Sequence, residues 1–259
     1  MSTLSYAVGD SATMLRRNLR HALRYPSMTI STIAMPVLIL LLFNYAFGGA
    51  LAAGIHGGGD YIDYVAPGII LMAATAGSVT TAVAVCSDMT EGIINRFWTM
   101  AIARTSVLTG HVVGSMIQTL VSIALVIAIA IAVGFRPTAG PGDWVAAIGL
   151  LALVTFALTW LSAAFGLVTK SVEAASNAAL PLTFLPFIGS AIVPTDSMPT
   201  VMRVFAENQP FTPIIETLRG LLMGTEIGDS AILAVAWSVG LALAGYLWAR
   251  AAFNREPTI

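Results

Sequence analysis

The chain has 259 residues, of which 57% are hydrophobic and 10% are charged, and its mean hydropathy is +0.86. A soluble domain is roughly a quarter charged, so these few charges could not cover the surface of a soluble protein of this size. The 12 basic residues do not outnumber the 13 acidic ones, which argues against a basic nucleic-acid-binding face, and the single cysteine excludes a disulfide scaffold. What remains is a membrane protein, and its long uninterrupted apolar runs predict helices rather than a barrel.

Six apolar runs are long enough to cross a bilayer as helices, since a span needs about 20 apolar residues. These runs cover residues 28–47, 64–85, 112–134, 144–168, 176–193 and 231–249. The chain is therefore predicted to be an all-α polytopic membrane protein with six transmembrane helices. No polar stretch between them could form a soluble domain, so residues 1–259 are expected to make one transmembrane domain.

The Lys and Arg residues gather on one side of this topology, which predicts that both termini are cytoplasmic. Nine of the twelve fall in segments on the side of the N-terminus. These nine are Arg16, Arg17, Arg20, Arg24, Arg96, Arg104, Lys170, Arg250 and Arg255. The three on the other side are Arg136, Arg203 and Arg219. The inverted orientation would place nine positive charges outside and is rejected.

Residues 11–25 are predicted to form an amphipathic helix on the inner surface of the membrane. Leu15, Leu19 and Leu23 recur every four residues beside a stripe of arginines. Adjacent apolar and basic faces suit a helix at the level of the lipid headgroups. The alternative is a basic anchor that only fixes the orientation. In either case the polar residues before the first span are unlike a cleaved signal peptide.

The inner loop over residues 87–107 is the most informative cytoplasmic segment. Asp88 and Glu91 have the spacing of a capping box, which predicts a new helix that starts at Asp88. That helix would expose Phe97 and Trp98 beside Arg96, and an apolar knob rimmed by charge favours docking to another protein. Alternatively, both aromatic side chains belong to the interfacial aromatic belt.

The outer segment over residues 194–230 contains an apolar stretch, 213–223, that is too short to span the membrane. Such a length predicts a re-entrant helix. Glu216 and Arg219 are three residues apart, and their pairing would reduce the free-energy penalty of either charge at membrane depth. The alternative is an exposed external helix with a weak surface ion pair.

Two spans have the composition of helices that lie inside a protein assembly. The fifth contains Pro181 and Pro186, which interrupt the backbone hydrogen bonding of a helix, and the polar Asn177. The second is rich in Ala, Gly and Ser over residues 73–78, which allow close helix approach. We therefore expect the fifth span toward the centre of the assembly and close contacts between the second span and its neighbours.

The sequence has no motif for catalysis, ATP binding or metal binding. It contains no phosphate-binding glycine loop and no His/Cys cluster with metal-ligand spacing. His56 lies in a glycine-rich outer loop, where a flexible connection is expected rather than a metal site. No Asp, Glu, Lys or Arg lies well inside a predicted span, which argues against proton- or ion-coupled transport. If a molecule is transported, the energy is expected to come from a partner.

This combination of features resembles the ABC-2 type permeases, the membrane subunits of ABC exporters. The inner loop over residues 91–104 is similar to the family's cytoplasmic coupling helix. The outer stretches 194–199, 208–213 and 218–221 resemble the daunorubicin/doxorubicin-resistance branch. The chain has Ala101 where the family often has a proline, so the helix of the inner loop is expected to run longer here.

The resemblance implies that a separate nucleotide-binding subunit hydrolyses ATP and holds the Mg²⁺, so that this chain binds no cofactor and has no catalytic residue. Two permease subunits, identical or different, would assemble with two ATPase subunits in a bacterial plasma membrane. They would export a drug-like hydrophobic or amphipathic compound or a lipid. The ATPase would contact the inner loop at Glu91, Gly92, Arg96, Phe97, Trp98 and Arg104. The substrate would pass between spans two and five along Met72, Thr75, Asn177, Phe184 and Phe187.

Two other hypotheses are open at this point. A permease that exports a polysaccharide or glycolipid would need a more polar channel than these spans offer. A membrane scaffold or signalling subunit would transport nothing and would need no ATPase.

Overall fold

A computed structural model of the chain describes residues 26–52, 60–91 and 104–253. The described residues form helices joined by turns and contain no strand. In chain order the elements are α2 (Pro26–Leu41), the π-helical turn η1 (Leu42–Phe47), α3 (Gly48–Ala52), α4 (Tyr61–Thr90), α6 (Arg104–Val133), α7 (Pro141–Val168), α8 (Val172–Ile188), the 3₁₀ turn η2 (Thr195–Ser197), α9 (Thr200–Asn208), α10 (Phe211–Met223) and α11 (Ser230–Phe253). The predicted all-α class is therefore confirmed for this part of the chain, while the predicted helix over residues 11–25 lies outside it.

Within the described ranges, five helices are long and apolar enough to cross a membrane. They cover Thr32–Leu51, Tyr61–Thr90, Leu108–Val133, Pro141–Val168 and Ser230–Phe253. These match five of the six predicted spans. The remaining run, 176–193, corresponds to α8, which has only 17 residues and is shorter than a typical span.

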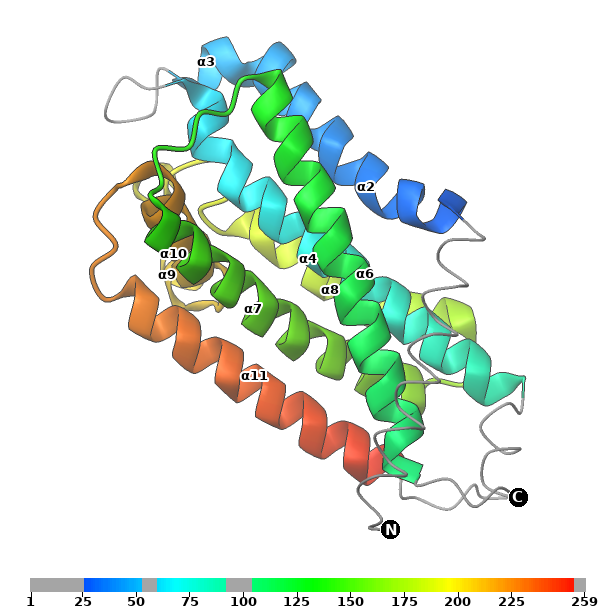
Figure 1. The fold of residues 1–259 in the computed structure, drawn as a ribbon. Coiled ribbons are helices and arrows are strands. Elements are labelled where there is room, and N and C mark those ends of the chain that lie inside the picture. The colour runs from blue at the N-terminus through cyan, green and yellow to red at the C-terminus, as the bar shows by residue number, and fades with distance from the viewer. Residues whose placement is uncertain (1–25, 53–59, 92–103, 254–259) are drawn as a thin grey trace.

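The helix α4 lies at the centre of the bundle. It contacts α2, α6, α7, α8 and α10, and Figure 1 shows it running between the other long helices. Of its most apolar stretch 72% is buried, against 28% for α6 and 22% for α11. The small residues of span two predicted close approach of neighbouring helices, which agrees with this burial.

Glycines set the distance between α4 and its neighbours. A Cβ at Gly68 in α4 would lie 2.6 Å from the Cβ of Ala191, which follows α8. A Cβ at Gly166 in α7 would lie 2.5 Å from the carbonyl oxygen of Ala82 in α4. Any larger residue would push these segments apart, and close approach is what helix packing in a membrane depends on.

The short helix α8 lies alongside α4 over most of its length. At one end, the Sγ of Cys86 in α4 lies 3.7 Å from the carbonyl oxygen of Thr169, just before α8 begins. At the other end, the hydroxyl of Tyr64 donates to the carbonyl oxygen of Ser190, just after α8 ends. The helix continues through Pro181 and Pro186 and ends at the Gly189 C-cap, so the prolines do not split it.

The predicted capping box at Asp88 and Glu91 is wrong. Asp88 lies inside α4, which continues to Thr90, and Glu91 is the C-cap of this helix rather than part of a new one. The Nε2 of His111 in α6 lies 2.7 Å from the Asp88 Oδ2, so this carboxylate pairs with a neighbouring helix instead of capping its own. The Glu91 carboxylate accepts a hydrogen bond from the hydroxyl of Ser87. Capping spacing alone could not exclude this arrangement, because an N-cap also requires non-helical backbone at that position.

The packing of α11 on α7 provides a test of the bundle. A Cβ at Gly245 in α11 would lie 2.6 Å from the backbone nitrogen of Leu161, whereas a Cβ at Gly240 in the same helix meets nothing within 4 Å. We expect G245L to lower the free energy of unfolding by about 1–3 kcal/mol through overpacking. Thermal unfolding of the purified protein in detergent measures this loss.

The matched control is G240L, which places the same side chain on the same helix. It should leave the unfolding temperature close to that of the unchanged protein. Equal stability of the two variants would contradict the close contact between α7 and α11.

Candidate functional site

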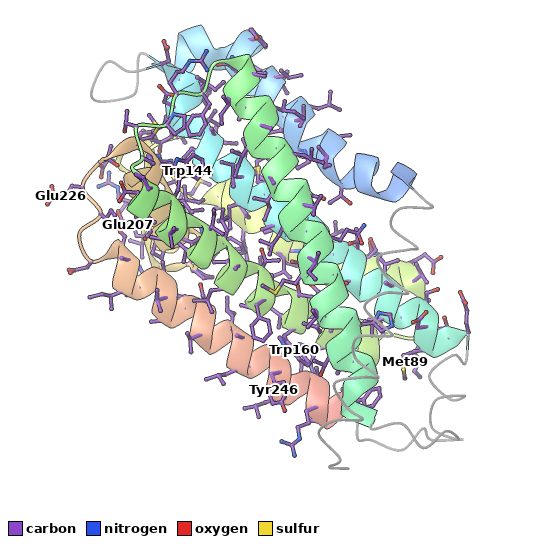
Figure 2. All side chains as sticks on the ribbon, in the orientation of Figure 1. Met89, Trp144, Trp160, Glu207, Glu226 and Tyr246 are labelled. Carbon is purple, nitrogen blue, oxygen red and sulfur yellow. The ribbon has the colours of Figure 1, made fainter. Side chains whose placement is uncertain are left out.

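The two ends of the bundle are formed by different segments of the chain. Met89 lies near one end, close to the last turn of α4, and Glu207, Glu226 and Trp144 lie at the opposite end (Figure 2). The last turn of α4 and the segment with α9 and α10 therefore lie at opposite ends of the bundle.

The helix α10 is a buried element at the end that carries Glu207. Most of its side chains are buried, including Phe211, Ile214, Ile215 and Leu218, and it contacts α4, α7, α8 and α11. It ends at Gly224, whose φ of 68° is the left-handed conformation that favours glycine at a helix C-terminus. The apolar stretch predicted over residues 213–223 is thus a helix packed into the bundle.

A buried arginine lies at the centre of a polar cluster at this end. The side chain of Arg219 in α10 is buried, and its Nη1 donates to the Oε1 of Glu216 at 3.1 Å. Its Nε donates to the carbonyl oxygen of Tyr64 at 3.2 Å, and its Nη2 donates to the carbonyl oxygen of Ser190 at 2.6 Å. We call Tyr64, Ser190, Glu216 and Arg219 the outer polar cluster.

The outer polar cluster joins three segments that are far apart in the sequence. The Arg219 guanidinium lies 3.8 Å from the centre of the Tyr64 ring, a cation–π contact, while the hydroxyl of the same Tyr64 donates to Ser190. A planar guanidinium satisfies a carboxylate, two carbonyl oxygens and an aromatic face at once. The arginine therefore holds α10 against α4 and against the turn that follows α8.

The sequence predicted part of this cluster. The Glu216–Arg219 pair is present, but nothing in the sequence indicated that Tyr64 and Ser190 belong to the cluster, since they are separated from Arg219 by 155 and 29 residues. An aromatic side chain at a predicted membrane boundary was the one available signal for Tyr64. A carbonyl acceptor such as that of Ser190 leaves no trace in a sequence.

The turn between α6 and α7 reaches the same end of the bundle. The backbone N–H of Arg136 donates to the Asp63 carboxylate at 2.9 Å, and the backbone N–H of Thr138 donates to the carbonyl oxygen of Leu222 at 2.9 Å. The ends of α4, α6, α7 and α10 on this side of the bundle are thereby joined to one another.

The five predicted path residues do not share one surface of the chain. Met72 and Thr75 in α4 are buried, and the Thr75 hydroxyl donates to the carbonyl oxygen of Met72 in its own helix. On α8, Asn177 is exposed and Phe184 is 57% exposed, whereas Phe187 is partly buried against the core cluster that contains Met72. The exposed part of the predicted path is therefore one face of α8.

Most of the predicted contact with an ATPase lies outside the described residues. Gly92, Arg96, Phe97 and Trp98 fall in 92–103, and Arg104 begins α6. The last described residue before this gap, Glu91, is exposed. His56 also lies outside the described ranges, and no group of His, Cys, Asp or Glu within them could hold a metal ion.

The family of the chain follows from sequence comparison. The sequence pattern of the ABC-2 type transporter family matches residues 11–223. The chain belongs to this family. The resemblance inferred from the inner loop and the outer segment is thus confirmed, and α2 to α10 all lie in the matched region of this ABC-2 chain.

Several relatives are similar to the ABC-2 chain over most of its length. A daunorubicin resistance ABC transporter permease protein of Streptomyces coeruleorubidus is 28% identical over 238 residues, 92% of this chain and 80% of that protein. A probable doxorubicin resistance ABC transporter permease protein of Mycobacterium tuberculosis is 24% identical over 212 residues, 82% of this chain and 76% of that protein. Nodulation protein J of Rhizobium leguminosarum bv. trifolii is 26% identical over 198 residues, 74% of this chain and 73% of that protein. The ABC-2 chain is therefore a multi-pass membrane protein related to drug-resistance permeases.

The outer polar cluster predicts how this ABC-2 chain responds to loss of its central cation. We expect R219M to lower the free energy of unfolding by about 2–3 kcal/mol, since hydrogen bonds from a charged group contribute roughly 1.5–3 kcal/mol. R219K should recover little, because an ammonium group cannot reproduce the planar set of contacts. Thermal unfolding or protease resistance in detergent measures both.

Two variants serve as controls for that prediction. Glu216 is 41% exposed, so E216Q removes a partly screened ion pair and should lower stability by less than about 1 kcal/mol. R203M removes a partly exposed arginine that donates to the carbonyl oxygen of Asp196. If R219M were as stable as R203M, the arginine would not hold α10 in place.

Proposed function

We propose that this chain is the transmembrane subunit of an ATP-driven ABC exporter in a bacterial plasma membrane. The observation that carries the proposal is the family match over residues 11–223, together with two drug-resistance permeases that align with most of the chain. The cargo would be a hydrophobic or amphipathic molecule, either a drug-like compound or a lipid. The alternatives, a polysaccharide exporter and a non-transporting scaffold, are outcomes of the test below.

We further propose that the chain crosses the membrane six times with both termini in the cytoplasm. The contacts at the two ends of α8 support the sixth crossing. They lie beside Cys86 and Tyr64 of α4, which are 22 residues apart in that helix, or about 33 Å at 1.5 Å per residue. That distance matches the roughly 30 Å thickness of a hydrocarbon core. The excess of Lys and Arg on the side of the inner loop supports the orientation.

In this topology α10 would be a re-entrant outer helix. It is too short to span, lies between long helices and carries a buried charge whose partners are all on the outer end. A charge at membrane depth is tolerated where it is paired and hydrogen-bonded, as Arg219 is.

The inner loop would bind a nucleotide-binding subunit that holds ATP and Mg²⁺. Two such subunits would act on two permeases, identical or similar, and the contact would involve Glu91, Arg96 and the aromatic pair Phe97 and Trp98. The continuation of α4 and α6 beyond the predicted spans supports this role, because two long helices then lead directly into the loop. Movement of the loop would reach the membrane part through both.

The substrate path would run along α8. Its exposed face bears Asn177, Leu180 and Phe184, which offers an apolar surface with one amide for a partly polar molecule. No ionisable residue lies well inside a span to bind an ion or to relay a proton, so an apolar cargo driven by a partner's ATP hydrolysis fits this path best.

Reconstitution tests the proposed function. The chain, co-purified with its ATPase subunit and placed in vesicles, should accumulate daunorubicin only with ATP, and vanadate should abolish the uptake. A labelled glycolipid in place of daunorubicin tests the polysaccharide/glycolipid alternative. Purification without any ATPase partner would favour a scaffold and would contradict the exporter.

The inner loop makes a separate prediction in the same vesicles. R96A should reduce daunorubicin uptake for each ATP hydrolysed, because it removes a charge at the proposed contact. R250A is the matched control, since Arg250 is an exposed basic residue at the inner end of α11 and outside the loop. Equal uptake per ATP in R96A and the unchanged complex would contradict the role of the loop.

Cysteine labelling tests the orientation. The chain has one cysteine, Cys86, which is buried, so background labelling should be low. A membrane-impermeant maleimide should label V201C, at an 84% exposed position, on intact cells, and should label R250C only after the cells are opened. The reverse pattern would contradict cytoplasmic termini.

A further inference from the structure

A largely buried contact between a histidine and an aspartate connects the two helices that lead into the inner loop. The Nε2 of His111 lies 2.7 Å from the Oδ2 of Asp88, and the exposed fractions of the two side chains are 8% and 16%. Asp88 is in the last turn of α4, which ends at Thr90, and His111 is in the second turn of α6, which begins at Arg104. An imidazole Nε2–H donates to a carboxylate whether the ring is neutral or charged. We call this pair the Asp88–His111 clamp.

The clamp lies directly beside an apolar cluster that spans four helices. One turn before Asp88, Val85 of α4 packs with Leu108 and Val112 of α6, on either side of His111. Trp160, Ala163 and Ala164 of α7 and Ala249 of α11 complete the cluster. A displacement of the clamped helix ends therefore reaches every long helix in contact with this cluster.

The same end of α4 is also fixed against α7. A Cβ at Gly166 of α7 would lie 2.5 Å from the Ala82 carbonyl oxygen of α4, and Cys86 contacts the turn that follows α7. This end of α4 is thus closely packed against α7, while the start of α6 is joined to it by the clamp and by apolar contacts.

We propose that the Asp88–His111 clamp is a positioning element for energy coupling, which makes α4 and α6 move as one body when the inner loop is displaced. The inference rests on the proposed function, because it assigns a role within the coupling of ATP hydrolysis to transport. Without the clamp, a force on the loop could separate the two helix ends instead of moving the bundle. Apolar residues could join the helices equally well for stability alone, since a buried ion pair is often no better than well-packed apolar groups.

The position of Asp88 and His111 explains why a hydrogen bond, rather than apolar contacts alone, joins α4 and α6 at this point. A directional, charge-assisted hydrogen bond fixes the relative register of two helices more strictly than apolar contacts, which allow sliding. It joins the two helices close to the points where the loop leaves α4 and enters α6. Asp88 and His111 are thus placed where a force on the loop would first act on the membrane part.

The test compares variants of the full complex in vesicles, with vanadate-sensitive ATP hydrolysis and daunorubicin uptake measured together. D88A and H111A should retain ATP hydrolysis but reduce uptake per ATP by about five- to tenfold, within the usual range of coupling between sites. D88N keeps an oxygen that accepts from the imidazole and should lie between D88A and the unchanged complex. The reciprocal exchange, Asp88→His with His111→Asp, should restore most of the ratio, which a change in packing alone would not achieve.

T90A is the matched control on the same turn of α4. The Thr90 hydroxyl donates only to carbonyl oxygens of Cys86 and Ser87 in its own helix, so its loss should leave uptake per ATP unchanged. Folding is checked by the unfolding temperature of each variant and by co-purification of the ATPase.

The outcomes separate the clamp from the proposed function. Folded D88A and H111A complexes with unchanged uptake per ATP would overturn the clamp and leave the exporter intact. If the double variant Asp88→His with His111→Asp had an uptake per ATP as low as that of the single variants, the clamp would also be overturned. If the complex without any substitution hydrolysed ATP but moved no daunorubicin, the proposed function itself would be contradicted. The clamp would then have no role in coupling.

Discussion

Close packing of one central helix is the constraint on which the rest of this structure depends. Lipid chains are as apolar as the helices, so helices in a membrane associate through close contact and hydrogen bonds rather than through burial from water. Small residues on α4 allow five other helices to approach it, and Gly68 and Gly166 mark the points where a single extra carbon would collide with a neighbour. The bundle is organised around this helix, with α8 alongside it and α10 held at its outer end.

Polar contacts occur at the two ends of α4 rather than along its middle. At the outer end, Arg219 joins α10 to Tyr64 and to the turn after α8. At the inner end, Asp88 pairs with His111 of α6. Between these ends the buried hydroxyls of Thr75 and Ser78 donate within their own helix. One long helix thus carries a specific polar contact at each of its ends.

The sequence predicted those features that depend on composition along one segment. Apolar length located the five long spans, small residues predicted close helix approach at span two, and i, i+3 spacing found the Glu216–Arg219 pair. Features that depend on residues far apart in the sequence were missed or were predicted wrongly. Asp88 looked like an N-cap because its partner His111 lies 23 positions away, and Tyr64 and Ser190 join Arg219 only through folding. The sixth crossing stays a prediction because α8 is short.

We expect a change at the inner loop to reach the opposite end of the bundle through α4. Hydrogen–deuterium exchange of the reconstituted complex, with and without ATP trapped by vanadate, tests this expectation. Nucleotide trapping should change exchange in the backbone of α10 and of residues 189–194, and the change should be lost in D88A. Identical exchange in α10 and residues 189–194 in both states of the complex without substitutions, despite trapped nucleotide, would show that α4 transmits no such change.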